Sequence, residues 1–187
     1  MQLASSSVPY QYADRRRDVL DNTESEFPWF ALRTRSNFEN VAALSLQNRG
    51  LKPYLPAYRN RRRWSDRIVV SDTPLFRGYV FCRFNPTDRL SVLTARGVVS
   101  IVSHGTEPAP VDEREIEAVQ TILCSGLATE PCPFLRLGQT VRVVRGALTG
   151  VEGVLVRKKS DFRLVISVTM LQRSVSVEIE REWVSVR

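Results

Sequence analysis

The last 51 residues of the chain, 137–187, contain 12 valines in short runs that are separated by turns. Valine is stiff at χ1 and disfavoured in helices, so a segment this rich in valine favours strands. The runs VRVV, GVEGVLV, FRLVISV, SVSVEI and WVSV predict about five short strands. That number is too small for a β-sandwich but suits a small barrel of SH3-like size, which we expect over residues 137–187.

Residues 28–124 show a different pattern, in which strand and helix segments alternate. WFALRT predicts a strand, and SNFENVAALSLQNRG predicts a helix with Ser36 and Glu39 at capping-box spacing and Gly50 at its end. The two prolines of LKPYLPAY favour an edge strand, and RRRWSDRIVV predicts a basic hairpin or loop. The apolar side of the helix is expected to comprise Phe38, Val41, Ala42 and Leu44.

The rest of this segment continues the alternation. RGYVFCRF and VVSIV predict strands, NPTDRLSVLTARG predicts a short helix, and a last helix follows Asp112 with Ile116, Val119 and Leu123 on one side. This order predicts an α+β sandwich, in which helices cover one face of a small antiparallel sheet and the other face stays uncovered. The polar residues 1–27 predict a flexible leader, and CSGLATEPCPF predicts a linker over 125–136.

Charge and composition limit the classes of function. The chain carries a net charge of +7, so a polyanion is a plausible partner. Three cysteines without C-x-x-C spacing and one histidine, His104, offer no ordinary metal site or catalytic set, and we expect no cofactor and no enzyme activity. The chain has no 18-residue apolar run and its first residues have no apolar signal core, so we expect a cytoplasmic protein without membrane contact.

The strand RGYVFCRF, residues 77–84, matches the RNA-binding signature K/R-G-F/Y-G/A-F-V-x-F/Y except at Val80 and Cys82. Alternate residues of a strand share a face, so Tyr79 and Phe81 are expected on one side and Val80 and Cys82 on the other. Rings on an uncovered face could stack on RNA bases, contact a protein, or form part of a core. The motif alone leaves these alternatives open.

The order of several motifs decides in favour of a known family. WFALRTRSNFENVA, a basic hairpin, TPLFRGYVFCRF, ARGVVSIVSHGTEPAPV and LGQTVRVVRGALTGVEGVLV resemble the NusG family from about Trp29 to the C-terminus. PLFRGYVF with ARGV is most similar to the RfaH/UpxY-type antiterminator paralogues. The resemblance implies an N-terminal RNP-like domain (NGN) over 28–124 and a C-terminal KOW barrel over 137–187, acting as a monomer.

The resemblance also implies partners and contact residues. In the family, an aromatic patch of the first domain packs on the clamp helices of the largest RNA polymerase subunit. Carried over by position, this implies that Phe76, Tyr79, Phe81 and Phe30 contact polymerase. Non-template DNA or nascent RNA is the implied partner of Arg35, Arg59, Arg61, Arg62, Arg63 and Trp64, although a solvated hairpin remains the alternative.

The C-terminal module matches the KOW motif through Gly146, Gly150 and Gly153. Glycine is the residue expected at tight turns and where two backbones approach closely. In the family this module recruits a ribosomal protein or Rho. The resemblance therefore implies a transcription elongation or antitermination factor. The alternative is a stand-alone RNA-binding protein with an RRM-like domain.

Overall fold

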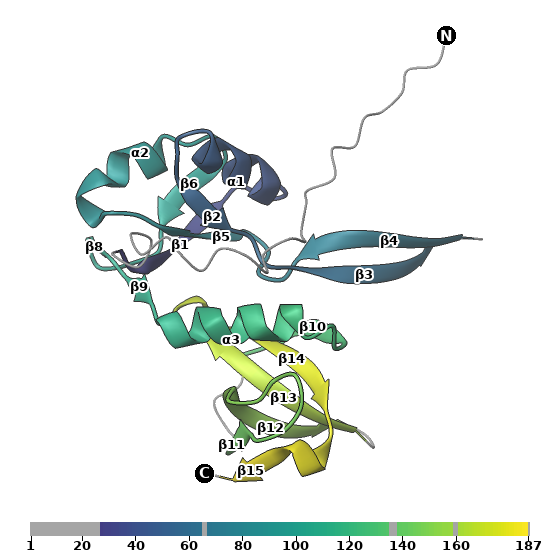
Figure 1. The fold of residues 1–187 in the computed structure, drawn as a ribbon. Helices are drawn as coiled ribbons and strands as arrows, with labels where there is room; N and C mark the ends of the chain where they lie inside the picture. The colour runs from purple at the N-terminus through teal and green to yellow at the C-terminus, as the bar shows by residue number, and fades with distance from the viewer. Residues whose placement is uncertain (1–26, 65–66, 135–137, 159–160, 187) are drawn as a thin grey trace.

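The computed structural model describes residues 27–64, 67–134, 138–158 and 161–186, so the predicted leader lies almost wholly outside the described residues. Two antiparallel sheets are stacked with one helix between them (Figure 1). None of the helices in the described ranges is long and apolar enough to span a membrane. The predicted fold class, an α+β part followed by a small β-rich part, is confirmed, whereas the domain boundaries stay a prediction.

The N-terminal sheet is centred on β1, and its strands run in the order β2-β5-β1-β6 with β9 also paired to β1. WFALRT forms β1 as predicted, and the edge position predicted for LKPYLPAY is confirmed because β2 pairs only with β5 among the described strands. The strands are β1 (Trp29–Thr34), β2 (Lys52–Tyr54), β5 (Tyr79–Arg83), β6 (Val98–Ile101) and β9 (Pro110–Val111).

One face of this sheet is covered by α1 (Glu39–Gln47) and α2 (Arg89–Leu93), which follows the short 3-10 helix η1 (Pro86–Asp88). The predicted apolar side of α1 is partly wrong, because Leu44 is 54% exposed and Val41 is also exposed. Ala42, Ala43 and Leu46 face the sheet instead, since small alanine side chains let the helix backbone approach it closely.

The predicted capping box of α1 is also absent. The Glu39 carboxylate is buried and accepts a hydrogen bond from the backbone N–H of Gly78 at 2.7 Å, which lies outside the helix. Gly50 ends the helical segment with φ +77°, as the sequence predicted. Glu39 therefore ties α1 to the turn that precedes β5.

The expectation that the other face of the sheet is uncovered is wrong. The helix α3 (Glu113–Cys124) lies on that side of the sheet (Figure 1), and its buried Ile116, Val119 and Ile122 share one apolar cluster with residues of this sheet and of the C-terminal part of the chain. Asp112 caps the helix as expected, because its carboxylate accepts from the N–H of Arg114 at 2.9 Å. The N-terminal sheet is therefore sandwiched between α1 and α2 on one side and α3 on the other.

Two hairpins extend from this sheet. β3 (Ala57–Trp64) and β4 (Arg67–Pro74) pair along their whole lengths and project away from the body of the molecule (Figure 1). The predicted basic hairpin is therefore confirmed as a two-stranded ribbon. The second hairpin is much shorter and joins β7 (Ser103–His104) to β8 (Glu107–Pro108).

The C-terminal sheet has six strands in the described ranges, in the order β10-β14-β13-β12-β11-β15, and it curves around its own core (Figure 1). All five predicted strands are confirmed. The strands are β10 (Thr129–Pro133), β11 (Gln139–Val143), β12 (Glu152–Lys158), β13 (Asp161–Val168), β14 (Arg173–Ile179) and β15 (Val184–Val186), with 3-10 helices η2 (Thr169–Leu171) and η3 (Arg181–Trp183).

The strand β10 lies inside the segment that was predicted as a linker. TEPCP pairs with β14 from Thr129 opposite Val177 to Pro133 opposite Arg173. Its two prolines suggested an irregular connection, but proline is compatible with an edge strand when its missing N–H faces away from the ladder. Only residues 125–128 separate α3 from this sheet.

Candidate interaction surfaces

The alternation predicted for β5 is confirmed. Val80, Cys82 and Phe84 face α1 and α2, whereas Tyr79 and Phe81 face α3.

Burial raises the pKa of the Cys82 thiol to about 12, so this cysteine is neutral in the fold at ordinary pH. No group of three His, Cys, Asp or Glu side chains within the described ranges is placed to hold a metal ion.

Three of the four residues assigned to polymerase contact are buried. Phe81 is 0% exposed and its ring meets the edge of Phe76 at a centroid distance of 5.6 Å. Phe76 is 1% exposed and belongs with Phe81 to the cluster that includes Ile116 of α3. The expectation that these rings project from an uncovered face is therefore wrong, because they are buried in an apolar cluster that α3 and the C-terminal sheet share.

Phe30 lies on the opposite face of the sheet. It is 2% exposed and packs on Phe84, with ring centroids 4.7 Å apart. This follows from the register, which pairs Phe30 with Cys82. Phe30 is a core residue of the α1 side, and it cannot contact a partner that docks on the side of Tyr79.

Tyr79 is the one aromatic assigned to polymerase that is only partly buried, at the margin of the cluster. The guanidinium of Arg173, at the start of β14, lies over its ring at 6.0 Å from the centroid. The C-terminal sheet thus covers part of the ring that α3 leaves accessible. Sequence reasoning missed Arg173, since no local pattern links residues 94 positions apart.

A charged network fixes the position of α3 on the N-terminal sheet. The carboxylate of Glu113 accepts from Trp29 Nε1 at 3.2 Å and forms an ion pair with Arg83. The Arg83 guanidinium also stacks on the Trp29 ring at 4.7 Å from the centroid. Two residues further on, Glu115 accepts from the backbone N–H of Thr169 at 3.2 Å, on the side of the C-terminal sheet.

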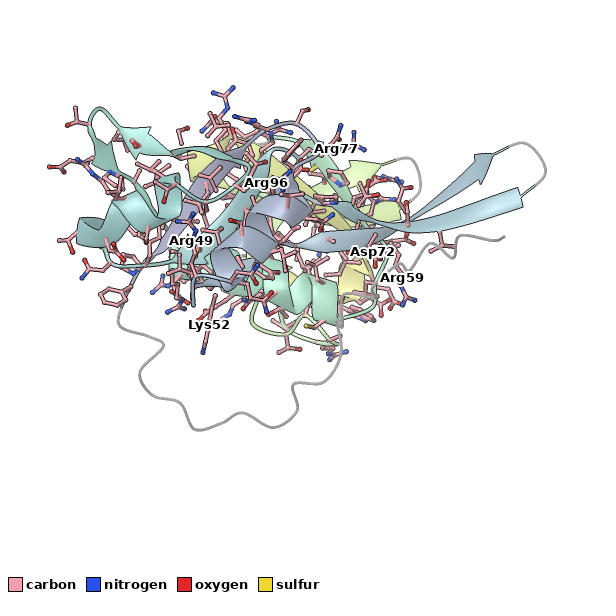
Figure 2. The ribbon with its side chains drawn as sticks, turned by 90° about the horizontal axis from the view of Figure 1, so that it is seen from above. Arg49, Lys52, Arg59, Asp72, Arg77 and Arg96 are labelled. Atoms are coloured by element: carbon pink, nitrogen blue, oxygen red, sulfur yellow. The ribbon has the colours of Figure 1, made fainter. Side chains whose placement is uncertain are left out.

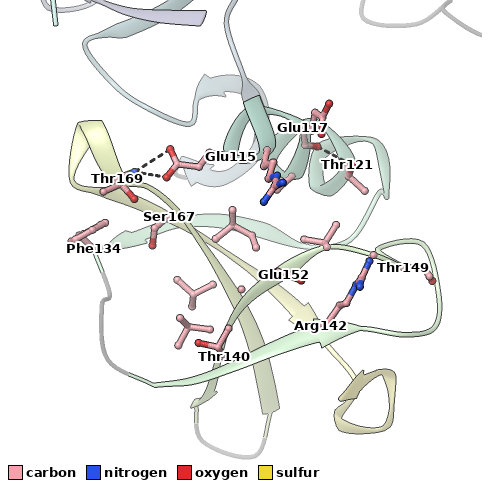
Figure 3. Close-up of a pocket in the computed structure, with 18 residues that line it drawn as sticks. Glu115, Glu117, Thr121, Phe134, Thr140, Arg142, Thr149, Glu152, Ser167 and Thr169 are labelled. Atoms are coloured by element: carbon pink, nitrogen blue, oxygen red, sulfur yellow. Dashed lines mark hydrogen bonds between the residues drawn. The ribbon is translucent and has the colours of Figure 1, made fainter. Parts of the chain in front are cut away.

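A groove of about 1000 Å³ lies between α3 and the C-terminal sheet (Figure 3). Its wall on the α3 side carries Glu115, Glu117 and Thr121, and the opposite wall carries Arg142 and Thr140. The packing between α3 and this sheet is therefore incomplete. The buried residues of α3 belong to one continuous apolar cluster that includes side chains of both sheets.

Backbone hydrogen bonds bring three exposed arginines from separate turns to one end of the N-terminal sheet. The N–H of Arg35 donates to the carbonyl of Gly97 at 2.9 Å, which places Arg35 next to Arg96 in the fold. The N–H of Thr34 donates to the carbonyl of Gly78 at 2.8 Å, beside Arg77. Figure 2 labels Arg77 and Arg96 close to α1. Sequence reasoning found Arg35 but missed the other two, because only the folded turns bring them together.

The basic residues of the hairpin are only partly described. Arg59 is exposed on β3, opposite Asp72 (Figure 2). The side chains of Arg61, Arg62, Arg63 and Trp64 lie outside the described residues, and only their backbone pairing with residues 67–70 is defined. Their assignment to nucleic acid stays a prediction.

The glycines of the C-terminal module have the backbone roles that were predicted. Gly146 and Gly150 have φ +82° and +93°, which other residues rarely adopt. A Cβ at Gly146 would also lie 3.0 Å from the ring of Trp183. Gly153 allows close approach of β13, because a Cβ there would come within 2.6 Å of the carbonyl oxygen of Val165.

Comparison with known proteins links this fold to one family. The family model described as "Transcription termination factor nusG" matches residues 27–120. The structure described as "Domain interaction in Thermotoga maritima NusG" covers 85% of this chain and 96% of its own chain, at 20% identity and a TM-score of 0.52. That similarity supports the fold. A search of curated proteins found no match.

Two further solved structures belong to the MjSpt4:Spt5 complex. Conformation B matches at 16% identity, covering 84% of this chain and 95% of the other, with a TM-score of 0.27. Conformation A matches at 15% identity, covering 85% and 97%, with a TM-score of 0.28. At these TM-scores neither bears on the fold. The family model spans half of the chain and includes the N-terminal sheet with its aromatic and basic surfaces, so the protein belongs to the NusG family.

Proposed function

We propose that the protein is a transcription elongation and antitermination factor that binds RNA polymerase through its N-terminal part and a second partner through its C-terminal sheet. Membership of the NusG family supports a role in transcription. The observation that carries the proposal is the aromatic cluster of β5, which ends in the partly buried ring of Tyr79. The expected polymerase element is the clamp helices of the largest subunit.

The polymerase contact is centred on Tyr79. Phe81 and Phe76 are buried in the shared apolar cluster and support the position of this ring rather than touching a partner. Arg173 covers part of the Tyr79 ring, so the docked arrangement of the C-terminal sheet is a closed state for this surface. Binding to polymerase requires that the sheet leave Tyr79.

Nucleic acid next to the polymerase is the expected partner of the basic surfaces. Exposed Arg35, together with Arg77 and Arg96, would contact phosphates of non-template DNA or nascent RNA. The hairpin β3–β4 carries further arginines on a ribbon that extends from the body (Figure 1). These contacts position the factor and add a salt-dependent contribution to its affinity.

The mechanism needs no catalytic step. A factor that binds the elongating clamp conformation more tightly than the paused one shifts the population by its differential affinity alone. The C-terminal sheet then recruits a ribosomal protein or Rho.

Co-purification of RNA polymerase tests this function. A tagged full chain should retain polymerase subunits from a cell extract after nuclease treatment, and the Tyr79→Ala variant should lose them. Tight binding to short single-stranded RNA without polymerase would favour the RRM-like alternative. The burial of Phe81 under α3 disfavours that alternative, because an RRM stacks bases on exposed rings of this strand.

A further inference from the structure

The connection between α3 and the C-terminal sheet is too short to let the two separate freely. α3 ends at Cys124 and β10 begins at Thr129, so four residues, 125–128, join them. At about 3.6 Å per residue they span at most about 14 Å when fully extended. They are also ordered, because Leu127 packs on the shared apolar cluster and its N–H donates to Ser125 Oγ at 3.2 Å.

The strand that follows this connection lies at the edge of its sheet. Among the described strands, β10 pairs with β14 alone. The N–H of Glu178 donates to the carbonyl of Ala128 at 3.3 Å. Since hydrogen-bonded and non-hydrogen-bonded pairs alternate in an antiparallel ladder, the even-numbered residues of β10 are the hydrogen-bonded ones. Glu130 and Cys132 occupy hydrogen-bonded positions. Pro131 and Pro133, which have no N–H to donate, occupy the alternate positions that are not hydrogen-bonded.

The pairing of β10 with β14 covers five residues, and an ion pair adds to it. Glu130 pairs with Arg163 of β13 at 3.0 Å, and the side chain of Glu130 is 43% exposed. The Arg163 side chain is only 18% exposed, so this ion pair is partly buried and holds the middle of β10. Separation of β10 disturbs the apolar core least among the strands of this sheet, as none of its side chains described over 129–132 is fully buried.

The far end of β10 lies where the two parts of the molecule touch. Pro133 is paired with Arg173, whose guanidinium covers Tyr79. The turn before Arg173 contains Thr169, whose N–H donates to Glu115 of α3. Arg173 of β14 is therefore both the partner of β10 and the residue that contacts Tyr79.

We propose that β10 is a releasable strap that controls whether the C-terminal sheet can leave α3 and Tyr79. While β10 is paired, the connection consists of the four residues 125–128. When β10 separates from β14, the connection includes at least residues 125–134, which can span about 36 Å. The inference concerns two parts of this chain and stands whether or not RNA polymerase is the partner.

A disulfide that locks β10 onto β14 tests the strap. Cys132 lies opposite Ser174, and a hydrogen-bonded antiparallel pair has a Cα separation of about 5.5 Å, which a disulfide can bridge. The variant is Ser174→Cys with Cys124→Ser, which removes the exposed cysteine, while Cys82 is buried. The oxidised and reduced forms of this one full-length protein are matched controls for each other.

The readout is amide hydrogen exchange of Thr169, measured by NMR in both forms. With β10 locked, we expect exchange at Thr169 to slow by about tenfold or more, because the contact with Glu115 can no longer open. Equal exchange in the oxidised and reduced forms would overturn the proposal, since the sheet would then swing away on residues 125–128 alone.

A second variant decides the question if the lock disturbs folding. Eight Gly and Ser residues inserted between Gly126 and Leu127 lengthen the connection without touching β10. Exchange at Thr169 should become about tenfold faster, while the amides of Glu130 and Cys132 keep their parental rates. Unchanged exchange at Thr169, or equal acceleration in β10, would overturn the proposal.

Discussion

Tyr79 and Phe81 are two residues apart on the same face of β5, yet their environments differ. Phe81 is 0% exposed and packs on Phe76 within the shared apolar cluster, whereas Tyr79 is partly buried at its margin under Arg173. Strand alternation predicted that these rings share a face, but it could not predict that a helix beginning 32 residues after Phe81 and the C-terminal sheet would form one buried cluster around Phe81. The two residues therefore have different expected roles, one in stability and one in binding.

Phe81→Ala should destabilise the protein. Removing a fully buried phenylalanine ring leaves a cavity between the sheet and α3, and substitutions of this kind cost about 3–5 kcal/mol. Urea unfolding followed by circular dichroism measures the free energy of unfolding. A loss below about 1 kcal/mol would contradict the packing described between Phe81 and α3.

Gly146→Ala should destabilise the C-terminal sheet more than Gly105→Ala destabilises the N-terminal part. Both glycines have positive φ, at +82° and +61°, so each substitution carries the backbone cost of about 1–2 kcal/mol. Only the alanine at position 146 would meet a side chain, because its Cβ would lie 3.0 Å from Trp183, whereas a Cβ at Gly105 meets nothing within 4 Å. Thermal unfolding measures the loss of stability in each variant. Equal losses would show that the Trp183 side chain moves aside at no energetic cost.

At the scale of elements, the periodic segments were predicted well and the packing between them was not. WFALRT and the five valine-rich runs form strands because alternation and β-branched residues leave little choice. The apolar residues of α3 indicated that one side is buried, but this pattern does not say which sheet face the helix covers. β10 was missed because its two prolines are equally typical of a linker and of an edge strand.

The C-terminal sheet should be more stable with β10 than without it. A fragment of residues 128–187 keeps the partner of β14, whereas a fragment of residues 137–187 leaves that edge unpaired. We expect the longer fragment to have the higher midpoint of thermal unfolding, by about 4 °C or more for each kcal/mol that β10 contributes. Equal midpoints would mean that β10 adds nothing to this sheet.

The hairpin β3–β4 should contribute a salt-dependent part of the binding to the transcription complex. Replacing Arg61, Arg62 and Arg63 by Gln removes three charges, so affinity should fall at low salt and the slope of log K against log salt should decrease by up to about three. Titrations at several salt concentrations measure the slope. Identical slopes in variant and parent would show that the hairpin arginines are solvated and do not contact nucleic acid.

At the scale of the whole molecule, one apolar cluster connects both sheets through α3. The N-terminal sheet is held to α3 by buried side chains and by the network of Glu113, Trp29 and Arg83. The C-terminal sheet contacts α3 through the same apolar cluster and through Glu115, which lies beside the groove. In the proposed function, the contact between Arg173 and Tyr79 is the one that must open for Tyr79 to become accessible.

The affinity of the purified chain for core RNA polymerase, measured for the parent, Tyr79→Ala and Leu44→Ala, tests the central claim most directly. Leu44 is an exposed apolar residue on α1, on the opposite side of the sheet, so it is the matched control. We expect Tyr79→Ala to lose about 2 kcal/mol or more of binding free energy, roughly thirtyfold in affinity, without a change in unfolding midpoint. Leu44→Ala should bind like the parent. Equal binding by the parent and Tyr79→Ala, or a loss confined to Leu44→Ala, would contradict docking of polymerase at Tyr79.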